Sequence, residues 1–232
     1  MSPPVLITGG TQRIGLALTE HFLNQSVPVI VTYRRPKSAL NTLAQRGATL
    51  IQADFTQKSQ VERLILQIKS QTSGLRAIIH NASDWASESV DDNDFELIER
   101  MMQVHVYAPY RINMALAEQL MPAGDIIHFT DYVQDTGSDK HTAYAASKAA
   151  LHNLTLSFAK KLAPQVKVNS IAPSLLMFNE KDDLAYRRQA DAKHLLSPAP
   201  GAYEAVSAVD YLLNSDYITG QTLHLSGGRH LR

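Results

Sequence analysis

Short apolar runs rich in β-branched residues alternate along this chain with longer segments of helical periodicity. The first run, residues 5–8, leads into a segment whose apolar residues, Ile14, Ala17, Leu18 and Phe22, recur at helical spacing. Strands that alternate with helices in this way form βαβ units, in which helices cover both faces of a parallel sheet. The alternation therefore predicts an α/β chain with a doubly wound, mostly parallel sheet.

The same pattern continues to the last residues. We expect further strands at 27–33, 48–53, 75–81, 125–130, 166–171 and 222–225, and helices around 61–68, 95–104, 144–162 and 202–213. Because no linker, repeat or low-complexity stretch interrupts the pattern, residues 1–232 are predicted to form one domain of about seven strands. The segment 174–200 is too long for a plain connection and is interpreted as a substrate lid or as a surface excursion with a short helix.

Composition excludes several classes of protein. Lys plus Arg and Asp plus Glu number 22 each, so no net charge favours nucleic acid or an anionic membrane. The absence of cysteine excludes disulfides and thiolate metal sites, and the nine histidines show no metal-ligand spacing with carboxylates, so no metal is expected. Residues 1–5 do not begin a secretory signal, and no run of about 18 apolar residues predicts a membrane span. We expect a soluble cytoplasmic protein.

A glycine-rich turn, residues 8–15, joins the first strand to the first helix. Gly9 and Gly15 allow the backbone to turn tightly and to approach a pyrophosphate that lies at the helix N-terminus. Because the turn belongs to the first βαβ unit, it predicts a dinucleotide-binding site.

The end of the second strand indicates which dinucleotide is bound. An NAD site usually has a carboxylate there for the ribose 2′-hydroxyl, whereas this chain has Arg34 and Arg35. Guanidinium groups pair with a 2′-phosphate, so NADPH/NADP+ is favoured over NAD; the alternative is a pair of solvated surface arginines. Asp54, which closes the third strand, is a candidate for a contact with the adenine edge or for a strand-ending turn.

Tyr144 and Lys148 lie four residues apart at the start of an Ala-rich helical segment, so both side chains share one helix face. An ammonium group beside a phenol stabilises the phenolate and is expected to lower the tyrosine pKa from about 10. The pair therefore predicts an acid/base centre in which Tyr144 donates a proton near neutral pH.

Together these motifs resemble the short-chain dehydrogenases/reductases. The resemblance covers essentially the whole chain, through Thr8-Gly9…Gly15, Asn81-Ala82, Tyr144-Ala-Ala-Ser-Lys148, Val168-Asn169-Ser-Ile-Ala-Pro173 and Gly227-Gly228. It implies a single-domain Rossmann fold, with Tyr144 as the catalytic acid/base and Lys148 on the nicotinamide ribose. It also implies cofactor contacts from Gly9, Arg13, Ile14, Gly15, Asn81, Ala82 and Pro173.

Departures from the family pattern concern the substrate. Asp131 occupies the usual serine position, Arg13 replaces a loop glycine, and Ser83 and Trp85 follow Asn81-Ala82. These replacements resemble the pteridine reductases. The resemblance implies that Trp85 stacks a pterin against the nicotinamide and that Arg13 and Ser83 contact pterin or phosphate. The alternatives are a half-buried loop tryptophan, a phosphate contact alone for Arg13, and a turn cap for Ser83.

The chemistry of Asp131 supports the same interpretation. An ionised carboxylate would repel the oxygen of a ketone, whereas the C=N nitrogen of a dihydropterin must gain a proton as hydride reaches the adjacent carbon. We expect Asp131, with its pKa raised by burial, to help Tyr144 deliver that proton. The resemblance to the pteridine reductases implies NADPH-dependent reduction of 7,8-dihydromonapterin, and also of dihydrofolate, in pterin and folate metabolism. A carbonyl or 3-oxoacyl reductase and a catalytically silent NADP(H)-binding sensor are the alternatives.

Two further expectations follow from the resemblance. His105 aligns with an asparagine that holds a proton relay in the family, and it is interpreted as a substitute for that group or as a hydrogen-bonded core histidine. The family also implies a homotetramer formed through two long helices. Small residues that would allow close packing there, or equally inside one subunit, are Ala145, Ala146, Ala149 and Ala150.

Overall fold

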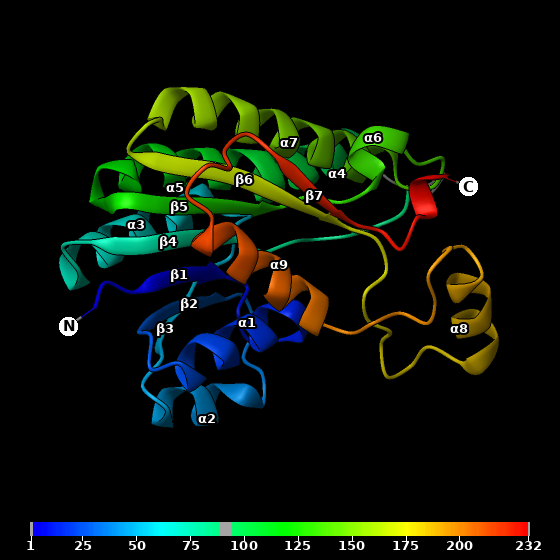
Figure 1. Ribbon diagram of the computed structural model, residues 1–232, viewed down its shortest axis with the longest axis horizontal. Coiled ribbons are helices and arrows are strands. Elements are labelled where there is room, and N and C mark those ends of the chain that lie inside the picture. Colours follow the sequence, from blue (N-terminus) through cyan, green and yellow to red (C-terminus); the bar gives the residue numbers. More distant parts are fainter. Residues whose placement is uncertain (1, 89–93, 232) are drawn as a thin grey trace.

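A seven-stranded parallel sheet with the strand order β3-β2-β1-β4-β5-β6-β7 forms the centre of the molecule (Figure 1). The computed structural model describes residues 2–88 and 94–231. The central strands are buried along almost their whole length, as expected for a sheet covered on both faces. The strands are β1 (Val5–Thr8), β2 (Val29–Tyr33), β3 (Thr49–Gln52), β4 (Leu75–His80), β5 (Leu120–Phe129), β6 (Val166–Pro173) and β7 (Thr222–Leu225).

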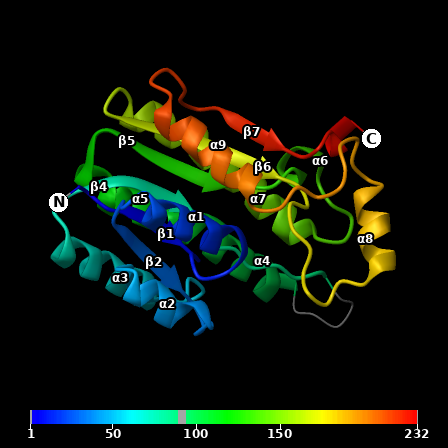
Figure 2. The ribbon, with the colours of Figure 1, turned by 60° about the horizontal axis from the view of Figure 1, so that its bottom comes forward.

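Helices cover the two faces of the sheet and enclose two separate apolar cores. One core lies under α3 (Lys58–Gln71), α5 (Ala108–Leu116) and α7 (Thr142–Leu162), with α4 (Asp94–Met102) packed beside α7. The other lies under α1 (Arg13–Asn24), α2 (Ala39–Gln45) and α9 (Tyr203–Asn214), and Figures 1 and 2 show α1 and α9 side by side. The remaining helical elements are the π-helical turn η1 (Gln103–Tyr107), α6 (Val133–Thr136), α8 (Leu184–Asp191) and the 3₁₀ turns η2 (Ala117–Gln119) and η3 (Arg229–Leu231).

The order of the strands places a crevice at the carboxyl ends of β1 and β4, in the middle of the sheet. The chain runs outward from β1 through β2 to β3 and then returns to β4 on the other side of β1. At such a reversal the loops after the two adjacent strands separate, and ligands bind outside the carboxyl ends of the strands. The segments 9–15 and 81–85 follow β1 and β4 and therefore border this crevice.

The predicted single-domain Rossmann architecture is confirmed, with differences in detail. Strand β5 starts at Leu120, five residues earlier than expected, and α2, α5 and α6 were not predicted. Segment 174–200 does contain a short helix, α8, which lies next to the C-terminal end of the chain in Figures 1 and 2. Within residues 2–88 and 94–231, no helix combines the length and apolarity needed to cross a membrane.

Candidate active site

A cavity of about 590 Å³ lies along the carboxyl ends of the strands. It brings together every residue that the sequence singled out for cofactor, substrate or catalysis, from seven separate parts of the chain. The roles of these residues stay predictions, but their proximity is a property of the fold. They are Gly9, Arg13, Ile14, Gly15, Arg34, Arg35, Asp54, Asn81, Ala82, Ser83, Trp85, Asp131, Tyr144, Lys148 and Pro173.

The turn after β1 has no room for side chains at its two key glycines. Gly9 has a φ of +66°, and a Cβ there would lie 2.9 Å from the Cα of Ala82. A Cβ on Gly15 would collide with the Gly9 carbonyl oxygen and the Asn81 amide. That amide donates to the carbonyl oxygens of Thr8 and Gly9, both at 3.1 Å, so Asn81 fixes the turn from the end of β4.

Cations gather at the carboxyl end of β2. Arg34, Arg35 and Lys37 all line the cavity, and Lys37 was not predicted. Asp84, which was also missed, lies between predicted residues and pairs with Arg34, with 3.2 Å from Nη1 to Oδ2. Asp54 forms the strand-ending turn that was one of its two predicted roles, and its Oδ1 accepts from the backbone N–H and the hydroxyl of Thr56.

These features fit an NADP dinucleotide. The first turn of α1 contains no acidic residue, and its N-terminus opens into the glycine-lined cradle, where unpaired N–H groups favour a pyrophosphate. The three cations at the end of β2 suit a 2′-phosphate, for which a guanidinium offers paired donors. The cavity therefore offers hydrogen-bond donors with positive charge or positive partial charge to both the pyrophosphate and the 2′-phosphate.

Tyr144 and Asp131 are in direct contact. Tyr144 stands in the first turn of α7, and its phenol donates to Oδ2 of Asp131 across 2.9 Å. Asp131 follows β5, and its Oδ1 accepts the backbone N–H of Val133 at 3.1 Å. Lys148, one helical turn further along α7, is buried and donates from Nζ to the carbonyl oxygen of Phe129 at 2.9 Å. Its Nζ lies 5.5 Å from the centroid of the Tyr144 ring.

The pKa values in this group differ from one expectation. Burial raises the pKa of Asp131, as predicted, against the opposing effects of the Val133 N–H and the Lys148 charge. Burial, followed by the neighbouring Asp131, raises the pKa of Tyr144 well above 10, so the predicted lowering is wrong. Lys148 does not lower the Tyr144 pKa as expected, because its ammonium group donates to the carbonyl oxygen of Phe129. The phenol O–H instead donates to the carboxylate of Asp131. Burial also lowers the pKa of Lys148 to about 8.

His105 joins the loop after β4 to helix α7. Its Nε2 accepts the backbone N–H of Asp84 at 3.2 Å, so the ring proton is on Nδ1, which donates to Oγ of Ser147 at 2.8 Å. The Ser83 hydroxyl also contacts Nε2, at 2.9 Å. Burial lowers the pKa of His105 well below 6.5, so the ring is neutral. His105 is thus a hydrogen-bonded core histidine, and it holds two of the segments that line the cavity.

Trp85 and Arg13 also line the cavity, and their contacts differ from those expected. Trp85 is 61% exposed, so the half-buried alternative is wrong, and its ring packs at a tilt against that of His141, with 4.5 Å between the centroids. Arg13 donates to Oδ1 of Asn179 at 2.5 Å and to the carbonyl oxygen of Met177 at 2.9 Å. This link between the glycine-rich turn and segment 174–200 was not predicted, because no motif connects residues so far apart in sequence.

The fold and this site define the class of protein. A family model described as enoyl-(acyl carrier protein) reductase matches residues 9–230, and the chain belongs to the short-chain dehydrogenase/reductase family. It is 56% identical over 232 residues to a dihydromonapterin reductase of Enterobacter sp. (strain 638), covering 98% of this chain and 97% of that protein. A dihydromonapterin reductase of Escherichia coli O6:H1 is 55% identical over 235 residues, covering 100% and 98%.

A solved structure gives the same picture. FolM alternative dihydrofolate reductase 1 from Brucella suis, in complex with NADP, superposes with a TM-score of 0.89 at 30% identity, covering 100% of this chain and 96% of that one. The family resemblance seen in the sequence is therefore confirmed.

Proposed function

We propose that this protein is an NADPH-dependent reductase that converts 7,8-dihydromonapterin to tetrahydromonapterin and also reduces dihydrofolate to tetrahydrofolate. The observation that carries the proposal is the hydrogen bond from Tyr144 to Asp131, in a cavity that Trp85 borders. A carboxyl group at that position suits a nitrogen that gains a proton better than a carbonyl oxygen. The proposal is supported by the relatives, which are dihydromonapterin reductases, and by the structural neighbour, which is an alternative dihydrofolate reductase.

The chain's own residues handle the proton. When bound, NADPH supplies the hydride that the carbon of the C=N bond receives. Tyr144 is a neutral phenol at physiological pH, because its pKa is raised by burial and by Asp131, and its O–H donates a hydrogen bond to Asp131. The adjacent nitrogen of the substrate takes a proton from this Tyr144–Asp131 pair. Lys148, charged below a pH of about 8, favours the negative charge that the pair acquires on losing the proton.

The recognition of substrate and cofactor belongs to the surrounding residues. We assign the 2′-phosphate to Arg34 and Arg35, with Lys37 beside them, and the pyrophosphate to the turn that holds Gly9 and Gly15. Trp85 stacks on the pterin plane, for which its exposure leaves one face available. Segment 174–200 forms a lid over the substrate, held to the glycine-rich turn by the Arg13 hydrogen bonds.

We also propose a cytoplasmic homotetramer that assembles through α4, α5 and α7. Large apolar side chains are exposed on the first two of these helices and on the π-helical turn between them, namely Phe95, Ile98, Tyr107, Tyr110 and Met114. On α7, Ala146 is exposed and Ala149 and Ala150 are half-buried, which leaves room for a close helix contact. Ala145 is buried within the subunit and serves the internal packing instead.

The test is NADPH oxidation followed optically, with 7,8-dihydromonapterin, dihydrofolate and a panel of ketones offered in parallel and NADH as the control. We expect turnover with both pterins and little with ketones or NADH. Tyr144→Phe should lower kcat by about 10²- to 10⁴-fold while NADPH affinity is kept. Activity confined to ketones would contradict the proposal, and NADPH binding without any turnover would favour a sensor.

A further inference from the structure

A second cavity, of about 430 Å³, lies beside the active site and has no part in the reaction described above. Its wall begins at Tyr132, the residue after Asp131, and continues to Thr136 at the end of α6. The rest of the wall comes from two segments that are distant in sequence, the turn after α8 and the C-terminal turn η3. Figures 1 and 2 show these segments near each other. They contribute Ala192, Lys193, Arg229 and His230.

Backbone contacts clamp these two segments together. The N–H groups of Leu195 and Leu196 both donate to the carbonyl oxygen of Gly227, at 2.8 and 2.9 Å. Gly227 and Gly228 have φ values of +54° and +75°. A Cβ at Gly228 would come within 2.8 Å of the Leu195 side chain, and one at Gly227 within 2.9 Å of the Leu196 carbonyl. The glycine pair therefore permits a close approach that holds the cationic side chains on both segments around one cavity.

The cavity carries positive charge without a compensating carboxylate in its wall. Within residues 2–88 and 94–231, neither Lys193 nor Arg229 forms an ion pair, and no acidic residue lines the cavity. The Arg229 guanidinium is held over the ring of Tyr132, with 4.6 Å from Cζ to the centroid. His230 is fixed through its Nδ1, 2.8 Å from Oγ of Ser226. A wall of this kind attracts an anionic group.

The cavity adjoins the active site. Burial is the main influence on the pKa of Asp131, and the charge of Arg229 is among the groups that oppose it, which places this guanidinium within electrostatic reach of the active site. Tyr132 follows Asp131 directly in the chain and lies under the Arg229 guanidinium, so the cavity wall that holds the aromatic ring and the cations adjoins the active site.

We propose that this cavity binds the carboxylate-bearing tail of dihydrofolate while the pterin ring lies in the active site. The inference rests on the proposed function and adds a subsite to it. In dihydrofolate the pterin carries a p-aminobenzoyl group followed by glutamate, so an aromatic ring precedes two carboxylates. Tyr132 suits the ring, and Lys193 and Arg229 suit the carboxylates. The side chain of dihydromonapterin is uncharged and gains nothing from these cations.

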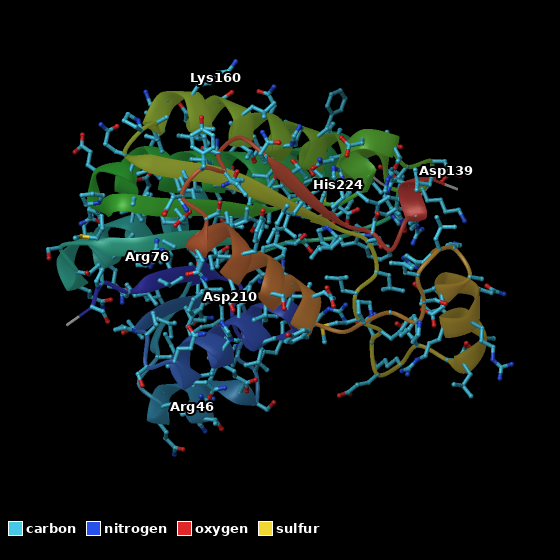
Figure 3. The ribbon with its side chains drawn as sticks, viewed as in Figure 1. Arg46, Arg76, Asp139, Lys160, Asp210 and His224 are labelled. Carbon is cyan, nitrogen blue, oxygen red and sulfur yellow. The ribbon has the colours of Figure 1, made fainter. Side chains whose placement is uncertain are left out.

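The experiment compares the two substrates in the full-length protein at saturating NADPH. The variants are Lys193→Met, Arg229→Met, the double variant and the conservative Arg229→Lys. Lys160→Met, at the exposed far end of α7 (Figure 3), is the matched control. In the double variant the KM for dihydrofolate should rise about tenfold or more, and the KM for dihydromonapterin should stay within about twofold. Arg229→Lys should restore part of the affinity. In the wild type, added salt should raise the KM for dihydrofolate alone.

A second measurement does not depend on turnover. Free p-aminobenzoyl-glutamate should compete with dihydrofolate in the wild type and lose this effect in the double variant. An unchanged KM for dihydrofolate, or an equal rise for both substrates, would overturn the subsite while the proposed function stands. A wild type that reduces neither pterin would remove the proposed function and the subsite together. If a phosphorylated dihydropterin responds to the substitutions and dihydrofolate does not, the glutamate assignment is wrong.

Discussion

When a carboxyl group and a phenol are in contact, their ordinary pKa values determine which of the two loses its proton first. In the active site Asp131 accepts the hydrogen bond of Tyr144, and the pKa of each is raised by burial before any other cause. The phenol starts from a much higher ordinary value, so the carboxyl group is the one that ionises as the pH rises. The proton that titrates in this pair is therefore that of Asp131, while the Tyr144 phenol keeps its own proton and stays hydrogen-bonded to the carboxyl group.

Replacing the carboxyl group by an amide separates these contributions. Asp131→Asn keeps the size of the side chain and removes both its charge and its acidic proton, so we expect kcat for dihydromonapterin to fall by about 100-fold or more with NADPH affinity unchanged. If protonated Asp131 is part of the donor, kcat/KM in the wild type falls as the pH rises through the raised Asp131 pKa, and the variant lacks this step. The measurement is the pH profile of kcat/KM for both proteins.

Asp135→Asn serves as the control for that experiment, because Asp135 is exposed and its pairing is with His224 on β7, at 3.8 Å. Its profile should match that of the wild type. Undiminished turnover of dihydromonapterin by Asp131→Asn would show that the proton comes from elsewhere.

Single residues of the site were predictable where a motif fixes both type and spacing. Tyr144, Lys148 and the glycines of the first turn belong to such motifs, and all of them line one cavity. The direction of the Tyr144 pKa was not predictable, because it depends on which neighbour reaches the phenol oxygen. Helical spacing brings Lys148 near the ring, but only the path of the chain after β5 brings Asp131 to the oxygen.

At the scale of elements, the start of α7 matters most for the site, because its first two turns carry Tyr144 and Lys148. The residue before the helix, His141, makes no side-chain cap, and the first turn of α7 contains no acidic residue. Instead Oε1 of Glu88, in the loop after β4, accepts the N–H of Ala143 at 2.7 Å. A carboxylate at this place satisfies an unpaired N–H and opposes the positive end of the helix dipole.

Removing this cap should affect both stability and catalysis. Glu88→Ala is expected to lower the free energy of unfolding by about 1 kcal/mol and kcat by a few fold, because the N-terminus of α7 loosens around Tyr144. Although burial acts in the opposite direction, hydrogen bonds to backbone N–H groups lower the pKa of Glu88 below 4.5. Because the pKa of Glu88 is lower in the folded than in the unfolded chain, the stabilisation is fully present at pH values above the ordinary glutamate pKa. It is lost as the pH falls through the folded-state pKa.

Urea unfolding at neutral and at acid pH measures the effect of that cap. The difference between wild type and Glu88→Ala should shrink at acid pH. Glu20→Ala, on the exposed face of α1, is the control and should change neither stability nor kcat. A neutral-pH unfolding curve for Glu88→Ala that coincides with that of the wild type would exclude the cap.

Elements with strong periodicity were predicted well, and those whose place depends on distant partners were not. The strands and the helices α1, α3, α7 and α9 each have an apolar pattern of their own. The short helices α2 and α6 have few buried residues, so their sequences carry little signal. The clamp between Gly227 and the segment after α8 joins backbone groups about 30 residues apart, and no local pattern reports it.

At the scale of the whole molecule, packing of α7 against the sheet buries a lysine side chain at the active site. Lys148 is 2% exposed, and its Nζ donates to a backbone carbonyl, with no salt bridge to any residue of the described part of the chain. A carbonyl dipole compensates less of the cost of burying a charge than a carboxylate would. The molecule therefore gives up stability to keep a cation beside Tyr144, and that loss should be visible in the global unfolding equilibrium.

The pH dependence of unfolding tests this loss directly. Burial lowers the pKa of Lys148 from 10.5 to about 8, so between these pH values the unfolded chain binds more protons than the folded one. Stability from this group therefore rises as the pH increases through that window, by about 3 kcal/mol in all. Unfolding of the cofactor-free protein in urea should show this rise in the wild type but not in Lys148→Met, while Lys160→Met on the exposed end of α7 keeps it. Parallel curves for wild type and Lys148→Met would mean that Lys148 stays protonated in the folded protein, with its charge compensated by Asp131.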